Sequence, residues 1–138
     1  MQHWIVRIII ATALAAAIAA CSSTAAAPVG SSTPPVDEAQ ATEIARNALE
    51  GYNSGDYAVW ARDWSDLMTG AIKEADFLAF RDRFMPNTGR FVAIESVTYA
   101  ETKPGVHRYT FSVRFENLTA PVWFSFFDGS QEIEGVQF

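Results

Sequence analysis

The chain has 138 residues, of which 49% are hydrophobic, a length and composition typical of one globular domain. Its net charge of -6 disfavours nucleic acid as a partner and disfavours electrostatic adhesion to anionic lipid, because both need a basic surface. The single cysteine excludes an internal disulfide, so apolar packing must stabilise the fold. Ten Phe, four Trp and four Tyr predict a bulky aromatic core or an aromatic-lined cavity.

The amino terminus has the pattern of a secretory signal. Arg7 is the only charged side chain before the apolar residues 8–20, a run shorter than the roughly 20 residues that span a bilayer. This run ends in Ile18-Ala19-Ala20-Cys21, which resembles the lipobox of bacterial lipoproteins. The resemblance implies that residues 1–20 are a signal peptide and that Cys21 receives a diacylglycerol on its sulfur. An ordinary secretory signal or an uncleaved signal anchor is the alternative.

Lipidation would make this an extracytoplasmic protein of the cell envelope. Two acyl chains anchor a protein stably where a single chain does not. Ser22 after the cysteine resembles lipoproteins that diderm bacteria sort to the outer membrane; in a monoderm host the anchor would lie in the plasma membrane. Removal of residues 1–20 leaves nine basic and sixteen acidic residues, a net charge of -7. We expect no metal or cofactor, because the only thiol would carry the lipid.

A tether is expected between the lipid anchor and the folded domain. Residues 21–36 hold the lipidated cysteine and the sequence SSTAAAPVGSSTPP, which has no charge and no aromatic residue. Such a segment cannot bury enough apolar surface to offset its ordering entropy. A coil of about 14 residues spans roughly 20 Å. The domain that follows, residues 37–138, would therefore act near the membrane surface.

Three helices are expected in the first half of this domain. Asp37 can cap the first helix, and Asn53-Ser54-Gly55 marks its end. Asp56 can cap the second helix, and the third covers about residues 74–85 and is broken by Pro86. Apolar residues recur at three- and four-residue spacing in the first two helices: Ala41, Ile44, Ala45, Ala48, Leu49 and Tyr52, then Tyr57, Trp60, Ala61, Trp64 and Leu67.

After Gly89 the hydrophobic period changes to two, which predicts strands. They cover residues 90–101, 107–116, 122–127 and 133–138. The second strand alternates cleanly, as expected of a strand with one buried face. The third is apolar on both faces, which predicts a central strand covered on both sides. Helices followed by an antiparallel meander make the fold class α+β, with three helices packed on a four-stranded sheet.

Three short segments of the domain resemble one uncharacterised branch of the nuclear transport factor 2-like superfamily. They are Asn53-Ser54-Gly55-Asp56-Tyr57, Gly89-Arg90-Phe91, and Phe127-Asp128-Gly129 followed by Ile133-Glu134-Gly135-Val136. The resemblance covers about residues 37–138, with a short last strand. It implies a cone-shaped domain with a pocket between the helices and the concave face of a curved sheet. Some members of the superfamily, such as ketosteroid isomerases and scytalone dehydratases, catalyse acid/base reactions in that pocket.

Candidate pocket residues are mainly aromatic: Tyr52, Trp60, Trp64, Phe80, Tyr99 and Tyr109, with Glu95 as a carboxylate. Glu95 shares the parity of Val97 and could point inward, although we expect it to reach solvent or a cation such as Arg62 or Arg81. His107 follows the Pro104-Gly105 turn, where we expect it at the rim without a partner. No His–Asp pair or paired carboxylates can be recognised.

The sequence therefore favours a non-catalytic, lipid-anchored domain that binds an envelope protein or a small apolar ligand. A homodimer is compatible with the sequence. The alternative is a small isomerase or dehydratase that uses a carboxylate in the cone pocket, in which case a buried carboxylate should face an open cavity.

Overall fold

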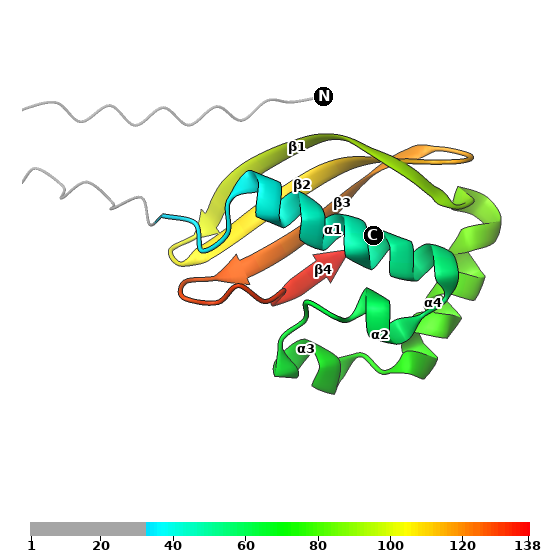
Figure 1. Ribbon diagram of the computed structural model, residues 1–138, viewed down its shortest axis with the longest axis horizontal. Helices are drawn as coiled ribbons and strands as arrows, with labels where there is room; N and C mark the ends of the chain where they lie inside the picture. The colour runs from blue at the N-terminus through cyan, green and yellow to red at the C-terminus, as the bar shows by residue number, and fades with distance from the viewer. Residues whose placement is uncertain (1–32) are drawn as a thin grey trace, which may run out of the picture. The chain divides into compact units, whose positions relative to one another are not determined.

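The computed structural model describes residues 33–138 (Figure 1). The predicted signal peptide, Cys21 and residues 22–32 of the predicted tether lie outside the described residues. Val36, which the sequence analysis assigns to the tether, is 1% exposed and belongs to the core. Its carbonyl accepts a hydrogen bond from the Tyr109 hydroxyl at 2.6 Å. The packed part of the chain therefore begins at Val36 or before it.

Four helices lie among the described residues: α1 Glu38–Ser54, α2 Tyr57–Trp60, α3 Asp66–Ala71 and α4 Glu74–Thr88. Asp37 caps α1 by accepting a hydrogen bond from the Gln40 backbone N–H at 2.8 Å, as expected. The apolar stripe of α1 is buried throughout. Gly55 ends α1 with a φ of 75°, a left-handed conformation that glycine adopts without strain.

The predicted second helix is wrong, because the chain divides it into α2 and α3. Trp64 forms a parallel bridge with Ile133, which draws residues 61–65 out of the helical conformation. The Ser65 N–H donates to the Ile133 carbonyl at 3.1 Å, and the Ile133 N–H donates to the Asp63 carbonyl at 2.7 Å. Ser65 then caps α3. Leu67, expected on the apolar stripe, is 69% exposed as a result.

The helix α4 is longer than the sequence predicts, because Pro86 does not break it. Proline removes one backbone donor from a helix, yet the last turn can still close through other donors. The Thr88 hydroxyl donates to the Phe84 carbonyl at 3.1 Å, and the Gly89 N–H donates to the Met85 carbonyl at 2.8 Å. The helix therefore ends at Gly89, whose φ is 74°.

The second half of the domain is a four-stranded antiparallel sheet with the order β1-β2-β3-β4. The strands are β1 Phe91–Lys103, β2 Val106–Phe115, β3 Thr119–Phe127 and β4 Gly135–Gln137. The long strands bend along their length, and α1 crosses one face of the sheet (Figure 1). The α+β class and the antiparallel sheet that the sequence predicts are confirmed, and the last strand is short.

Asn53 joins the helices to the sheet. Its side-chain amide donates to the Phe91 carbonyl at 3.0 Å and accepts from the Phe91 N–H at 2.7 Å. Asn53 thus completes the backbone hydrogen bonds of the first residue of β1, in the way a neighbouring strand would. Two of the segments singled out in the sequence, around Asn53 and around Phe91, are therefore in direct contact.

The two faces of the sheet differ in burial. On β2 the inward side chains Tyr109, Phe111, Val113 and Phe115 are all buried, and the outward ones are half-buried or exposed. The expectation that β3 is covered on both sides is wrong for its outward face. There Trp123 is half-buried beneath the Arg108 guanidinium, 4.1 Å from its ring centroid, and Phe127 is 43% exposed.

Candidate functional site

Four of the predicted pocket residues come together in an aromatic cluster between the helices and the inner face of the sheet. Trp60 lies 4.3 Å from Trp64 and 6.4 Å from Phe80, and Tyr52 lies 6.1 Å from Phe80, measured between ring centroids. Two residues that the sequence analysis did not select complete the cluster. Phe77 stacks on Trp60 at 4.4 Å, and Phe138 lies 5.3 Å from Phe80.

Phe80 and Phe138 divide the space inside this cluster into two hollows. The first has a volume of about 40 Å³ and is walled by Tyr52, Phe84, Thr88, Phe115, Ala120 and Val122 together with Phe80 and Phe138. The second, here called the aromatic cleft, has about 220 Å³. It is lined by Trp60, Ile72, Asp76, Phe80, Val136, Gln137 and Phe138. The aromatic cleft is smaller than a typical pocket for a drug-sized ligand. Its volume suits a small apolar molecule.

Both tryptophans of the cluster carry a buried hydrogen-bond donor that is not used. Trp60 is 3% exposed and Trp64 is 5% exposed, and neither indole Nε1–H has an acceptor among the described residues. A buried donor without a partner costs free energy, so such groups are rare in folded proteins. Trp60 also lines the aromatic cleft, but its Nε1 has almost no accessible surface, so the acceptor of a ligand would meet this donor only if the indole turned toward the cleft.

Among the described residues, Asp76 is the only carboxylate that lines the aromatic cleft. It is exposed, and its side chain accepts a hydrogen bond from the Lys73 backbone N–H at 2.9 Å at the start of α4. A carboxylate in this position caps a helix, which is a structural task. It does not have the burial expected of a catalytic carboxylic acid.

Glu95 does not face the aromatic cluster. The register of β1 against β2 shifts between Ile94 and Ser96, which is a β-bulge, and Ile94 and Val97 rather than Glu95 take the positions opposite inward residues of β2. The Glu95 carboxylate is exposed and forms an ion pair with Arg114 at 3.1 Å. The sequence analysis expected a cation such as Arg62 or Arg81, but the structure pairs Glu95 with Arg114 instead.

The two cations that were expected near Glu95 have other partners. Arg62 pairs with Asp63 at 3.1 Å. Arg81 donates from Nε to the Tyr52 carbonyl at 2.8 Å and satisfies the carboxyl end of α1.

Tyr99 and Tyr109 are neighbours in the sheet but do not line the aromatic cleft. Tyr109 is buried, and its hydroxyl donates a hydrogen bond to the Val36 carbonyl. Tyr99 is 41% exposed, and its hydroxyl lies 2.9 Å from His107 Nδ1. Of the predicted pocket residues, those on the helices and Trp64 between α2 and α3 are thus assembled, and those on β1 and β2 are not.

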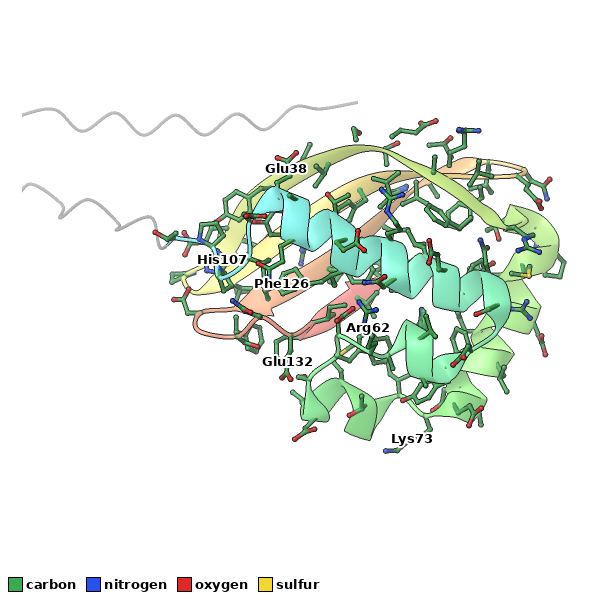
Figure 2. The ribbon with its side chains drawn as sticks, viewed as in Figure 1. Glu38, Arg62, Lys73, His107, Phe126 and Glu132 are labelled. Carbon is green, nitrogen blue, oxygen red and sulfur yellow. The ribbon has the colours of Figure 1, made fainter. Side chains whose placement is uncertain are left out.

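The prediction that His107 lies at the rim without a partner is wrong. The His107 side chain, labelled in Figure 2, is fully buried. Its Nε2 lies 2.6 Å from Asp128 Oδ1. A neutral imidazole that donates from Nε2 to the Asp128 carboxylate accepts at Nδ1 from the Tyr99 hydroxyl. The three residues form a hydrogen-bonded cluster, here called the His107 cluster, at the end of the sheet where the described chain begins.

The His107 cluster has the groups of a catalytic relay, but its imidazole does not reach solvent. Only Tyr99 and Asp128 are exposed. Burial raises the pKa of the Tyr99 phenol, and the negative charges of Glu101 and Asp128 raise it further, so Tyr99 holds its proton and is a poor base. The Asp128 N–H also donates to the Gly105 carbonyl at 3.1 Å. The His107 cluster therefore fastens the β1–β2 turn to the end of β3.

The sequence indicates this cluster only through the pairing of two strands. His107 follows one turn, Asp128 precedes another, and their strands pair so that Val106 faces Phe127. Recognising the pair from sequence would have required that register.

Residues 33–138 offer neither a metal site nor a membrane-spanning helix. In this part of the chain no group of three or more His, Cys, Asp or Glu side chains is arranged to hold a metal ion. The helices of the same residues are too short or too polar to cross a bilayer.

The sequence matches no protein-family model and no curated protein. Among solved structures the fold resembles the NMR structure of a protein from Ruminococcus gnavus ATCC 29149. The TM-score is 0.60 at 14% sequence identity, and the alignment covers 77% of this chain and 94% of that one. The similarity supports the α+β fold.

Proposed function

We propose that this protein is a lipid-anchored extracytoplasmic domain that binds a small apolar ligand in the aromatic cleft and does no chemistry on it. The observation that carries this proposal is the aromatic cleft of about 220 Å³, lined by Trp60, Phe80 and Phe138. The unused Nε1–H of Trp60 would add a hydrogen bond if the indole turned toward the ligand. The favoured ligand is an aromatic or aliphatic molecule with one hydrogen-bond acceptor. The acceptor would fix its orientation against otherwise apolar walls.

The fold within this proposal is of the nuclear transport factor 2-like kind. Helices that precede a bent antiparallel sheet, with an aromatic cleft between the two, support it. The isomerase or dehydratase alternative has less support, because Asp76 is exposed and occupied with a helix cap, and Glu95 is paired with Arg114 outside the cluster.

Ligand binding can be tested with a matched pair of probes, naphthalene and 2-acetylnaphthalene, on a chain that begins at Ser22. The two differ mainly by a carbonyl acceptor. We expect the ketone to bind more tightly by about fivefold, the value of one hydrogen bond of about 1 kcal/mol. Trp60→Phe should remove this preference and leave naphthalene binding similar. Trp123→Phe, on the outward face, is the control. A preference that survives in Trp60→Phe contradicts the proposal.

The membrane anchor is tested separately on Cys21. Cells that express the full chain are fed a clickable fatty acid, and labelling of the wild type is compared with that of Cys21→Ala. We expect the label only in the wild type, because the thioether forms on that sulfur. In a diderm host, Ser22 predicts that the labelled protein fractionates with the outer membrane. Equal labelling of the two chains would rule out the anchor while leaving the cleft experiment intact.

A further inference from the structure

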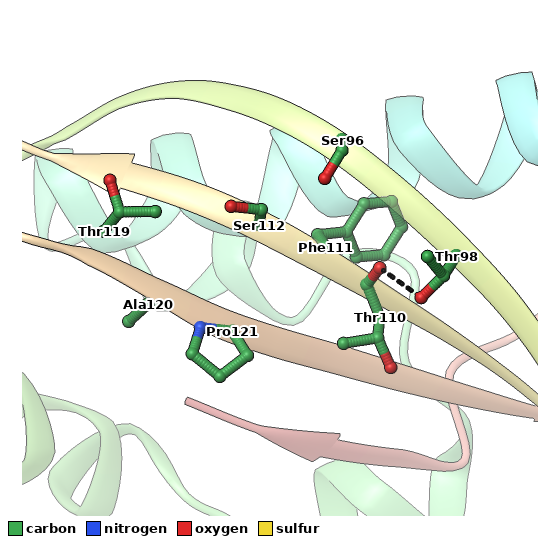
Figure 3. Close-up of a pocket in the computed structure, with 8 residues that line it drawn as sticks. All are labelled: Ser96, Thr98, Thr110, Phe111, Ser112, Thr119, Ala120 and Pro121. Carbon is green, nitrogen blue, oxygen red and sulfur yellow. Dashed lines mark hydrogen bonds between the residues drawn. The ribbon is translucent and has the colours of Figure 1, made fainter.

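The outward face of β2 is a row of polar side chains: Arg108, Thr110, Ser112 and Arg114. Between the two arginines the residues are small, and a groove of about 230 Å³ lies there. We call it the outer groove (Figure 3). The side chains that line it include Ser96, Thr98, Thr110, Ser112, Thr119 and Pro121. It lies on the face opposite the aromatic cluster and is independent of the aromatic cleft.

The outer groove offers hydroxyl groups rather than backbone groups. β2 is paired with β1 on one side and with β3 on the other, so its backbone N–H and C=O groups are used in the sheet. The Thr98 hydroxyl donates to the Thr110 carbonyl at 3.4 Å (Figure 3). Within residues 33–138 no hydrogen bond engages the hydroxyls of Ser96, Thr110 or Ser112. A hydroxyl both donates and accepts, which matches the hydroxyls of a sugar better than an extended peptide backbone.

The charge of this face is opposite to that of the protein. The sequence carries sixteen acidic and ten basic residues, yet the outward strand positions hold Lys103, Arg108 and Arg114. The bulge residue Glu95 is neutralised by Arg114 at 3.1 Å. Arg108 has no ion pair or hydrogen bond in the described part of the chain, and its Nε is buried without an acceptor. Its guanidinium rests on Trp123 at 4.1 Å. Neither residue lines the groove itself, but Arg108 precedes the lining residue Thr110 by two positions on the same face of β2.

We propose that the outer groove binds a glycan whose sugars carry carboxylate groups. The hydroxyls of Thr110 and Ser112 would contact sugar hydroxyls, and Arg108 would pair with the carboxylate. Arginine suits this role because its planar fork of N–H groups bonds both oxygens of a carboxylate.

The test compares three probes on the full-length chain in detergent, by isothermal titration calorimetry: oligogalacturonate, a neutral galactan oligosaccharide of the same length, and oligoglutamate. We expect oligogalacturonate to bind at least about tenfold more tightly than either of the others, because only it supplies both hydroxyls and carboxylates. Arg108→Gln should remove most of this advantage. Ser112→Val, which replaces the hydroxyl with methyl groups, should weaken binding of oligogalacturonate and of galactan.

Controls separate this site from the rest of the molecule. Arg83→Gln on α4 removes an exposed arginine away from the sheet and should leave binding unchanged. The response to 2-acetylnaphthalene should be the same in wild type, Arg108→Gln and Ser112→Val, because the aromatic cleft lies on the other face. Oligoglutamate that binds as tightly as oligogalacturonate would show an acidic-peptide or purely electrostatic site and overturn the proposal. Equal binding by wild type and both groove variants, or no binding of oligogalacturonate, would also overturn it.

Discussion

The two faces of β2 come from the same ten residues and carry opposite chemistry. Inward, Tyr109, Phe111 and Val113 are between 0% and 2% exposed and pack against the helices and the inward side chains of β3. Outward, Thr110 and Ser112 leave their hydroxyls open beside a groove. The inner face contributes stability because it removes apolar surface from water, and the outer face contributes little. Substitutions on the outer face can therefore change recognition without unfolding the domain.

The largest effect is expected on the inner face at Phe111, which is 0% exposed and opposes Val97 on β1 and Val122 on β3. Phe111→Ala should lower the free energy of unfolding by about 3–5 kcal/mol, because it removes a buried ring and leaves a cavity. Urea denaturation measures the loss. A loss below about 1 kcal/mol would mean that the inner face is not the core.

The helical layer that covers this face gives the second prediction. A Cβ on Gly51 would lie 2.4 Å from the Trp60 backbone nitrogen, where neither helix can yield. Gly51→Ala should therefore destabilise the domain by about 1–3 kcal/mol or more, although alanine alone favours a helix. Gly70→Ala in α3 is the control, because nothing lies within 4 Å of its added Cβ. The midpoint temperature of thermal unfolding should fall for Gly51→Ala and should stay level or rise for Gly70→Ala.

The third prediction concerns the inward hydroxyl of Tyr109. Tyr109→Phe leaves the Val36 carbonyl without its donor and should cost about 1 kcal/mol or somewhat more. Burial raises the pKa of the Tyr109 phenol, and the neighbouring Tyr99 phenol and the carboxylates of Asp37 and Glu38 raise it further. Unfolded tyrosine loses its proton near pH 10. The folded state keeps the proton to higher pH, so this contribution is complete below about pH 10 and is lost as the pH rises through the folded-state pKa.

Urea denaturation between about pH 8 and pH 11 tests that sign. The stability of the wild type should fall more steeply above pH 10 than that of Tyr109→Phe. Parallel curves would contradict the assignment to Tyr109.

The smallest effect is expected on the outer face. Thr110→Ala should change the free energy of unfolding by no more than about 0.5 kcal/mol, because its hydroxyl has no partner within the described residues and its side chain is only half-buried. Measured beside Phe111→Ala, it gives the contrast between adjacent residues of one strand. A loss comparable to that of Phe111→Ala would show that the outer face also packs.

Local patterns in the sequence were sufficient for much of the fold. The clean alternation of β2 identified Phe111 and Val113 as inward residues. The carboxylates of Asp37 and Asp56 marked two helix starts, where each caps a backbone N–H. These features depend on residues that are close in the chain, and their geometry follows from helix and strand periods alone.

Predictions from the regular strand and helix periods failed where the chain departs from regular geometry. Counting by twos from Phe91 puts Glu95 among the inward residues, but the β-bulge between Ile94 and Ser96 turns it outward to Arg114. In the same way the helical period continues through Trp64 in the sequence. The bridge from Trp64 to Ile133 interrupts the helix in the structure.

The sequence by itself determined the α+β class, the antiparallel meander and the two chemistries of β2, because each depends on the order of neighbouring residues. It also carries the lipobox-like segment that ends at Cys21, which predicts the location of the protein. Only the tertiary structure decided that His107 is buried between Tyr99 and Asp128, and that Phe138 fills space beside Phe80. Those contacts join residues distant in the chain, and strand register and helix packing set them rather than any local preference.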